Sequence, residues 1–229
     1  MPNHDEIYSR EAERYDQLIA SQPNLMEIVN ELMPIAGLDV LDMGAGTGRL
    51  TLALAPCVKS ILATDASAAM LKLTGERLRA SGMQHWGTAV ADHRSLPLED
   101  SCVDLAVSGW SICYLCASGV PEWRENLRQV MSEIERVLRP GGTVIIFETM
   151  GTGYETPQPP EFLLDYYRAL EEEYGFQHRW LRMDYQFESV EQAEDLTAFF
   201  FGKGLSERVR KERLTALPEC AGLWWRQFP

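Results

Sequence analysis

Hydrophobic and polar positions along this chain switch repeatedly between a helical and an extended pattern. Apolar residues recur at helical spacing in residues 5–20, 25–32, 50–55, 68–79 and 123–138. Short apolar runs typical of buried strands occupy residues 38–42, 60–65, 86–91, 102–108 and 143–148. Strands that alternate with helices in this way predict a parallel sheet with helices packed against it.

The pattern changes after Glu148. Residues 151–160 are rich in glycine, proline and threonine and predict a loop. A helical pattern then covers 162–174 and 190–213, whereas 178–187 and 223–228 alternate like strands. We expect this tail to complete the sheet.

A glycine-rich turn follows the first predicted strand. The chain reads Val40-Leu41-Asp42-Met43-Gly44-Ala45-Gly46-Thr47-Gly48-Arg49-Leu50, so a strand with a terminal acidic residue turns through three alternating glycines into a helix. Glycines let the backbone approach a ligand, and free N–H groups at a helix start can receive a carboxylate. A dinucleotide site has the spacing G-x-G-x-x-G, but the sixth position from Gly44 is Arg49. The spacing therefore disfavours a nicotinamide cofactor.

This turn matches the first motif, D-x-G-x-G-x-G, of the class I S-adenosylmethionine-dependent methyltransferases, and the chain resembles that family at two further places. Ala63-Thr64-Asp65-Ala66-Ser67 places an acidic residue at the end of the second strand. In the family this carboxylate accepts hydrogen bonds from both ribose hydroxyls. Val90-Ala91-Asp92-His93 is similar to the third element, in which Asp92 would accept from the adenine amino group and the His93 backbone would face the ring.

Two later stretches resemble the branch that includes quinone-biosynthesis methyltransferases. They are residues 95–105, which lead into the fourth strand, and 137–143, which form the turn before the fifth. The resemblance covers residues 36–150, with a weaker match at Tyr15-Asp16. It implies an α/β fold: a Rossmann-like three-layer sandwich with a mostly parallel seven-stranded sheet and an N-terminal helical lid.

The resemblance also implies one methyltransferase domain over residues 1–229. Its parts would be an N-terminal helical lid at 1–35, a cofactor-binding core at 36–150, and a substrate lid with the final strands at 151–229. We expect the lid of the tail to run from Tyr154 through Tyr185, because specificity in such folds resides in additions around the carboxyl ends of strands.

The resemblance implies a set of site residues. Those expected to bind S-adenosylmethionine are Tyr15, Asp42, Gly44, Ala45, Gly46, Gly48, Asp65, Ala66, Met70, Asp92, His93, Ser108 and Gly109. Those expected to face the substrate are Tyr8, Trp110, Tyr114 and Tyr154. For the tyrosines, Trp110 and Met70, ordinary core packing is the alternative.

No catalytic residue is assigned, because methyl transfer is an in-line displacement that needs no metal and no covalent enzyme intermediate. The segment after the fourth strand, 108–115, lacks the paired glutamates of arginine methyltransferases and an aspartate for a catechol-type magnesium site. A general base would be needed for a phenol or a carbon acid. Glu148, Tyr154 and His178 are open positions for one, each with a structural alternative.

The composition of the chain indicates which kinds of partner it binds, where it is located and how its cysteines are used. The 34 acidic and 21 basic residues give a net charge of -13, which disfavours nucleic acid and anionic membranes. No apolar run is long enough to span a bilayer and the first residues show no leader, so we expect a cytoplasmic protein, a monomer or a homodimer. Five scattered cysteines argue against a disulfide framework. Cys113 and Cys116 lack the partners of a zinc site.

These observations favour methyl transfer from S-adenosylmethionine to a small-molecule acceptor, with release of S-adenosylhomocysteine. Trp110, Tyr114 and the aromatic tail favour an aromatic or quinone-like acceptor. The alternative is a non-catalytic S-adenosylmethionine-binding sensor or scaffold, which would keep Asp42, Asp65 and Asp92. A nicotinamide oxidoreductase on a related fold is the third hypothesis, and it is disfavoured by the glycine spacing.

Overall fold

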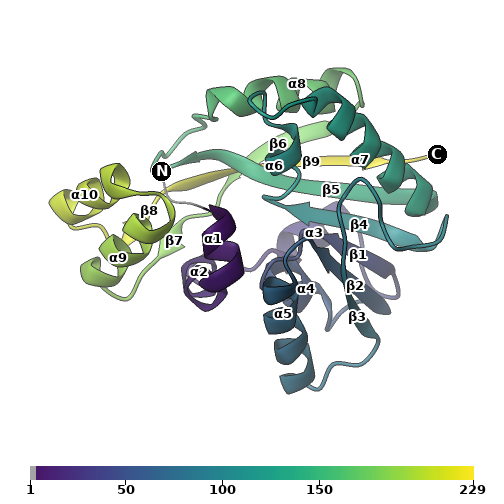
Figure 1. Ribbon diagram of the computed structural model, residues 1–229, viewed down its shortest axis with the longest axis horizontal. Helices are drawn as coiled ribbons and strands as arrows, with labels where there is room; N and C mark the ends of the chain where they lie inside the picture. The colour runs from purple at the N-terminus through teal and green to yellow at the C-terminus, as the bar shows by residue number, and fades with distance from the viewer. Residues whose placement is uncertain (1–3) are drawn as a thin grey trace.

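The computed structural model describes residues 4–229, and a seven-stranded sheet lies at its centre (Figure 1). The strands are β1 (Asp39–Met43), β2 (Ser60–Asp65), β3 (Trp86–Val90), β4 (Val103–Gly109), β5 (Leu138–Thr152), β6 (Gln177–Arg182) and β9 (Glu219–Gln227). Their order is β3-β2-β1-β4-β5-β9-β6. The pairs from β3 to β5 are parallel, and β9 is antiparallel to both of its neighbours. The predicted mostly parallel sheet is confirmed, and the tail completes it.

Helices cover both faces of the sheet. The helices α3 (Met26–Leu32), α4 (Arg49–Leu54) and α5 (Ala68–Ala80) lie on one face, and α7 (Trp123–Val137) and α8 (Leu164–Glu172) lie on the other (Figure 1). Alternate strand residues point to opposite faces, so Val40 packs with α3 and α4 whereas Leu41 packs with α7. Because both faces are buried at the centre of the sheet, the central strands β1, β4 and β5 are rich in buried apolar residues.

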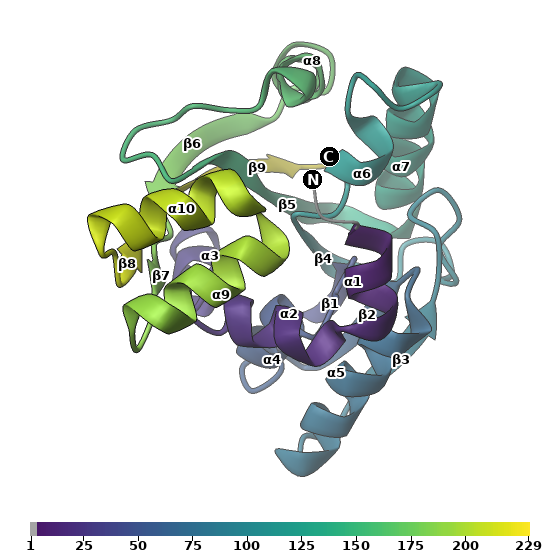
Figure 2. The same cartoon turned by 60° about the vertical axis from the view of Figure 1, so that its left-hand side comes forward.

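A cap of short elements lies outside these layers. It consists of α1 (His4–Arg10) and α2 (Ala12–Ile19) from the N-terminus, and of β7 (Tyr185–Gln186), α9 (Val190–Phe200), α10 (Lys203–Glu212) and β8 (Ala216–Leu217) from the tail. Figure 2 shows α9 beside α1 and α2 although almost the whole chain separates them in sequence. Arg14 and Asp195 join α2 to α9 by an ion pair of 2.7 Å. Residues 1–3 of the predicted lid lie outside the described residues.

The largest differences from the predicted elements lie in the cap. The helix expected over 190–213 is two helices, because Gly202 adopts a φ of +92° between them. The helix expected over 5–20 is likewise divided at Glu11. The strand expected over 178–187 ends at Arg182, where the chain leaves the sheet.

The tail also contributes to the sheet layers themselves. The predicted lid from Tyr154 to Tyr185 contains α8, whose Tyr166 and Leu170 are fully buried in the core on the α7 face. This segment also supplies the edge strand β6. The part of the tail that reaches α1 and α2 is α9, which comes after Tyr185.

Candidate active site

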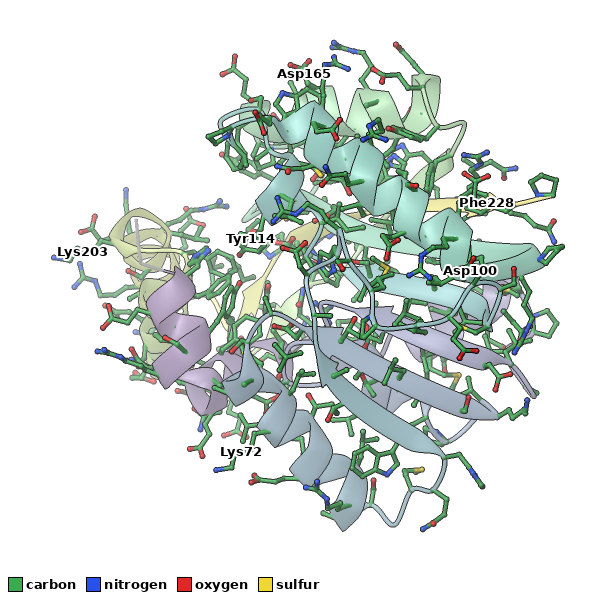
Figure 3. All side chains as sticks on the ribbon, turned by 45° about the vertical axis from the view of Figure 1, so that its right-hand side comes forward. Lys72, Asp100, Tyr114, Asp165, Lys203 and Phe228 are labelled. Atoms are coloured by element: carbon green, nitrogen blue, oxygen red, sulfur yellow. The ribbon has the colours of Figure 1, made fainter. Side chains whose placement is uncertain are left out.

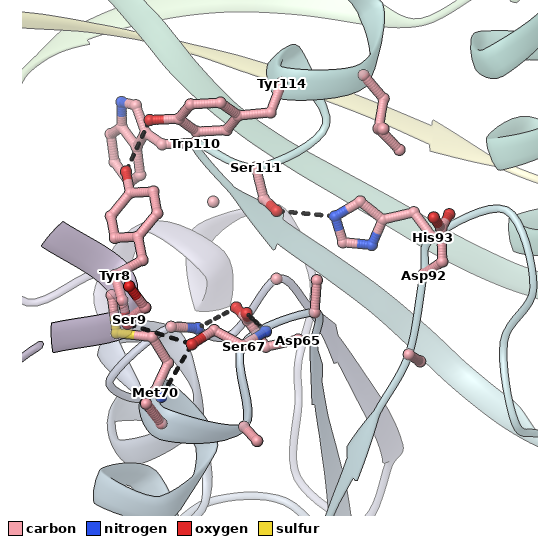
Figure 4. Close-up of a pocket in the computed structure, with 18 of the residues that line it drawn as sticks. Tyr8, Ser9, Asp65, Ser67, Met70, Asp92, His93, Trp110, Ser111 and Tyr114 are labelled. Atoms are coloured by element: carbon pink, nitrogen blue, oxygen red, sulfur yellow. Dashed lines mark hydrogen bonds between the residues drawn. The ribbon is translucent and has the colours of Figure 1, made fainter. Parts of the chain in front are cut away.

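A cavity of about 560 Å³ opens at the carboxyl ends of β1 to β4 (Figure 4). The sheet order reverses direction between β1 and β4, and ligands of open α/β sheets bind at such a point. Each strand contributes the residues that follow it, and α1, α2 and α5 close the sides. The lining residues are Tyr8, Ser9, Tyr15, Gly44, Gly46, Asp65, Ala66, Ser67, Ala68, Ala69, Met70, Ala91, Asp92, His93, Gly109, Trp110, Ser111, Tyr114 and Leu115.

The glycine turn after β1 forms one wall of the cavity. The N–H groups of Gly44 and Ala45 both donate to the Thr64 carbonyl, at 2.8 and 2.9 Å, so the turn is fixed to β2. Gly44 has a φ of +73°, and a Cβ there would lie 1.8 Å from Ser111 Oγ. Both the conformation and the close approach of Ser111 therefore require glycine at this position.

Asp42 lies beneath the turn and is fully buried. Its Oδ2 accepts from Thr51 Oγ1 of α4 at 2.5 Å, whereas Oδ1 has no hydrogen-bond partner among the described residues. Burial raises the pKa of Asp42 to about 7, because the apolar interior disfavours the charged form. The carboxyl group thus joins the end of β1 to the first turns of α4.

Asp65 stands at the end of β2 with both oxygens turned to backbone donors. Oδ2 accepts from the N–H of Gly46 at 2.9 Å, and Oδ1 accepts from the N–H of Ser67 at 2.7 Å. Since a carboxylate has about four lone-pair sites, each oxygen retains one for a further donor in the cavity. Ser67 in turn caps α5 by accepting from the N–H of Met70 at 3.3 Å.

Asp92 and His93 follow β3 on the opposite wall. Asp92 accepts three hydrogen bonds from Arg94, two at Oδ1 and one at Oδ2, and these bonds hold the pKa of Asp92 below its usual value. The His93 ring reaches across the cavity, where Nε2 lies 2.7 Å from Ser111 Oγ (Figure 4). Burial lowers the pKa of His93, so its imidazole is neutral near pH 7.

Aromatic residues from distant parts of the chain close the mouth of the cavity. The hydroxyl groups of Tyr8 on α1 and Tyr114 on α6 (Cys113–Cys116) lie 2.6 Å apart (Figure 4). Phe200 of α9 packs against Tyr15, with ring centroids 5.3 Å apart, and stacks on His4 at 4.5 Å. Figure 3 shows Tyr114 near the middle of the molecule, with Lys72, Asp165 and Lys203 at its periphery.

Asp16 fastens the N-terminal helices over the glycine turn. Its carboxylate accepts from Thr47 Oγ1 at 2.9 Å and forms an ion pair with Arg77 of α5. The Arg77 guanidinium also donates to the Thr47 carbonyl at 3.1 Å. The Tyr15-Asp16 pair therefore combines a residue that lines the cavity with a residue that anchors the helix.

Most of the residues predicted from the sequence meet at this cavity. Those that line it are Tyr8, Tyr15, Gly44, Gly46, Asp65, Ala66, Met70, Asp92, His93, Gly109, Trp110 and Tyr114. Asp42 and Ala45 line a smaller pocket directly behind the glycine turn. Gly48 precedes α4 with a φ of +96°, and Ser108 is buried within β4, so neither lines the cavity.

The residues considered as a general base lie away from the cavity. Tyr154 is 51% exposed and Glu148 is fully buried behind α6, where its Oε1 accepts from the Cys113 N–H at 3.0 Å. His178 stacks on Trp224 at the far edge of the sheet. Tyr154, which was also predicted to face the substrate, does not line the cavity.

Sequence reasoning missed three contributors to the site. Ser111 contacts His93, Ser67 caps α5 beside Asp65, and Phe200 covers Tyr15 from a helix more than 180 residues further along the chain. Ser67 could have been found, because serine directly before a helical pattern is a common N-cap. Nothing in the local sequence indicates the contacts of Ser111 and Phe200, which depend on how the elements pack.

Sequence comparisons find methyltransferases among the proteins that are similar to this chain. Residues 41–146 match the family model described as a methyltransferase domain. Over 149 residues the chain is 33% identical to a malonyl-[acyl-carrier protein] O-methyltransferase of Pectobacterium atrosepticum, covering 65% of this chain and 53% of the relative. Over 127 residues it is 33% identical to a demethylmenaquinone methyltransferase of Clavibacter sepedonicus, covering 56% and 45%. The chain thus spans about half the length of these curated relatives.

Solved structures share the fold at low sequence identity. The YcgJ protein from Bacillus subtilis superposes with a TM-score of 0.60 and 15% identity, over 90% of this chain and 97% of that one. A SAM-dependent methyltransferase from Aquifex aeolicus gives a TM-score of 0.58 and 16% identity, over 97% and 93%. These likenesses cover most of the chain, and they support the fold alone.

Proposed function

We propose that the chain is a class I, S-adenosylmethionine-dependent methyltransferase that methylates a small-molecule acceptor and releases S-adenosylhomocysteine, because residues 41–146 match a methyltransferase domain. The observation that carries the proposal is the cavity at the ends of β1 to β4, where the glycine turn, Asp65 and Asp92 meet. Its volume of about 560 Å³ lies within the range of small-molecule and cofactor sites.

The residues around the cavity fit the chemistry of the cofactor. Asp65 has free lone pairs on both oxygens for two ribose hydroxyl groups. Asp92 Oδ2 accepts one hydrogen bond from Arg94, which leaves room for the adenine amino group. Met70 lines the cavity on the same side and would pack on the adenine ring. The glycine turn and Tyr15 would then enclose the amino-acid end.

The bound cofactor supplies a methyl group on a positively charged sulfur, ready for attack by a nucleophile. The chain contributes orientation and exclusion of water, which can be worth about 7–11 kcal/mol in the best intramolecular models. Tyr8 and Tyr114 close the mouth through their hydroxyl groups, and burial raises the pKa of both, so they remain neutral donors near pH 7. Trp110 and Leu115 give the acceptor an apolar wall, which supports an aromatic or quinone-like acceptor.

An acceptor that must lose a proton finds a neutral imidazole in the cavity. His93 Nε2 lies 2.7 Å from the Ser111 hydroxyl, and the ring is uncharged near pH 7 because burial lowers its pKa. We place His93 as a proton acceptor for such a substrate, either directly or through Ser111. Glu148, Tyr154 and His178 do not line the cavity.

We extend the proposal to the organisation of the whole chain. The lid at 1–35, the core at 36–150 and the tail at 151–229 would act as one domain, with α9 and α10 as the part of the tail that covers the cofactor. The net charge of -13 supports a partner other than nucleic acid. No helix in residues 4–229 is long and apolar enough to cross a membrane. We propose a cytoplasmic location, where S-adenosylmethionine is made, and a monomer or homodimer.

Calorimetric titration with S-adenosylmethionine, S-adenosylhomocysteine and NAD tests the cofactor before an acceptor is known. We expect saturable binding of the two sulfur compounds and none of NAD. Binding of NAD alone would assign the chain to the oxidoreductases. Release of S-adenosylhomocysteine on addition of an acceptor then separates an enzyme from a sensor, and candidate acceptors include a quinol and a malonyl thioester, after the names of the relatives.

A further inference from the structure

A small inner pocket of about 30 Å³ lies behind the glycine turn. It shares Tyr15, Gly44, Gly46, Gly109 and Trp110 with the large cavity, so the two spaces meet at the turn. A space of this size admits a water molecule or one small polar group. A ligand in the large cavity can therefore reach into this pocket with one small group.

Arg49 lines the inner pocket with an unsatisfied guanidinium group. Its Nε and Nη2 are buried and have no hydrogen-bond partner among the described residues. The guanidinium lies over the Trp110 ring, with Cζ 3.9 Å from the ring centroid, and this contact holds it in place without using its in-plane donors. Glu219 attracts this charge electrostatically but accepts no hydrogen bond from it, so the in-plane donors remain open to a partner in the ligand.

The inner pocket also carries an unsatisfied acceptor. Asp42 lines the same pocket, and its buried Oδ1 makes no hydrogen bond within the described part of the chain. The pocket thus contains both in-plane N–H donors and a carboxyl oxygen that lack hydrogen-bond partners. An amino-acid group complements this pair, since its carboxylate accepts from a guanidinium and its ammonium donates to a carboxyl oxygen.

We propose that Arg49 is the carboxylate-binding residue of this site and that its ligand is the amino-acid end of S-adenosylmethionine. This inference rests on the proposed function. Arginine suits this role better than lysine, because the planar fork matches a carboxylate and stacks on an indole. A carboxylate on the acceptor offers the same chemistry, and the relatives named after malonyl substrates make it the other source to be tested. Such an acceptor lacks the ammonium group that would donate a hydrogen bond to Asp42 Oδ1.

The test compares two probes that differ in the amino-acid end. S-adenosylhomocysteine carries the ammonium and carboxylate groups, whereas 5′-methylthioadenosine carries neither. In Arg49→Gln we expect calorimetric affinity for S-adenosylhomocysteine to fall about 10- to 100-fold, because a charge-assisted pair is lost, while affinity for 5′-methylthioadenosine stays within about twofold. Arg49→Lys should fall between wild type and Arg49→Gln. Arg128→Gln is the matched control, because Arg128 pairs with Glu125 on the surface of α7.

Each other outcome overturns the assignment. Equal losses for both probes would mean that Arg49 only supports the fold. Unchanged S-adenosylhomocysteine affinity in Arg49→Gln, with malonate binding to the S-adenosylhomocysteine-saturated protein lost, would assign the carboxylate to the acceptor. Unchanged binding of all three probes would show that Arg49 binds no carboxylate. Failure of wild type to bind S-adenosylhomocysteine would instead refute the proposed function, so wild type is titrated before any variant is made.

Discussion

The carboxylate of Asp65 accepts a hydrogen bond from the backbone N–H of Gly46, with 2.9 Å between Oδ2 and the nitrogen. This contact ties the end of β2 to the glycine turn after β1, at the wall of the cavity. Asp65 therefore has two tasks in the proposed site. It holds the turn in shape, and it offers its remaining lone pairs to the ligand.

Replacing Asp65 should weaken cofactor binding more than it weakens the fold. We expect Asp65→Ala to reduce S-adenosylhomocysteine affinity by about 1–3 kcal/mol, because two acceptor oxygens are lost, and calorimetry measures this. Asp65→Asn should cost less, since one acceptor oxygen remains. Asp165→Ala is the control, because Asp165 pairs with Arg168 on the exposed side of α8 (Figure 3). Unchanged affinity in Asp65→Ala would refute the assignment.

Replacing Gly44 should be damaging, because a Cβ there would lie 1.8 Å from Ser111 Oγ and 2.3 Å from Ser111 Cβ. Gly37 is a matched control: its φ of +82° is similarly unfavourable for alanine, but nothing lies within 4 Å. Gly37→Ala should lower the free energy of unfolding by about 1–2 kcal/mol, and Gly44→Ala by about 1–3 kcal/mol more.

Urea unfolding measures both losses, and a second-site change identifies the clash. Ser111→Gly removes the atoms that would meet the new methyl group, so the double variant Gly44→Ala, Ser111→Gly should recover part of the difference. Similar losses in Gly44→Ala and Gly37→Ala would show that conformation, and not the approach of Ser111, requires glycine at position 44.

The sequence predicted the core of this protein better than its cap. The strand that ends at Asp42, the turn through Gly44 and the helix after Gly48 were all placed correctly, because each depends on neighbours within a few residues. The apolar strands are equally local signals. The predicted residues at four strand ends also met at one cavity, since parallel strands bring their carboxyl ends to the same edge.

The cap could not be predicted in the same way. The helix α9 packs against α10 of the tail and also against α2, and its contacts with α2, such as Asp195 with Arg14, join residues that are distant in sequence. The contact between His93 and Ser111 could not be predicted either, because the two residues meet only when β3 and β4 are in place. Arg49 was noted only as the residue that breaks a dinucleotide pattern, and its lack of a partner becomes visible only in three dimensions.

Glu148 should make the protein less stable as pH rises, whereas an acid whose pKa is lowered by an ion pair makes it more stable. Burial raises the pKa of Glu148 from 4.5 to about 7, so between these values the native state keeps a proton that the unfolded chain has released. Its contribution to stability is thus complete below pH 4.5 and is lost as pH rises to 7. Glu148→Gln has no ionisable group at this position. Between pH 4.5 and 7 the free energy of unfolding of the variant should therefore fall by about 3 kcal/mol less than that of wild type.

Urea unfolding at intervals between pH 4.5 and 8 measures this difference in slope. Any constant offset between the proteins reflects the new amide and is not part of the prediction. Glu161→Gln, at an exposed position, should run parallel to wild type. Asp42 and Glu219 also have pKa values raised to about 7, so Glu148→Gln should flatten the profile only in part. Parallel profiles for wild type and Glu148→Gln would contradict the prediction.

Phe200 connects the cap to the proposed cofactor site, because its ring packs on Tyr15, which lines the cavity. In Phe200→Ala we expect S-adenosylhomocysteine to dissociate faster and to bind about 1 kcal/mol more weakly, since the aromatic cover over Tyr15 is lost. Stopped-flow dissociation measures the rate. Phe199 is the matched control on the same helix, since its ring lies 4.4 Å from the Arg14 guanidinium and does not line the cavity. If Phe199→Ala accelerates release as much as Phe200→Ala, the effect comes from loosening α9 as a whole, and Phe200 has no particular role as a cover.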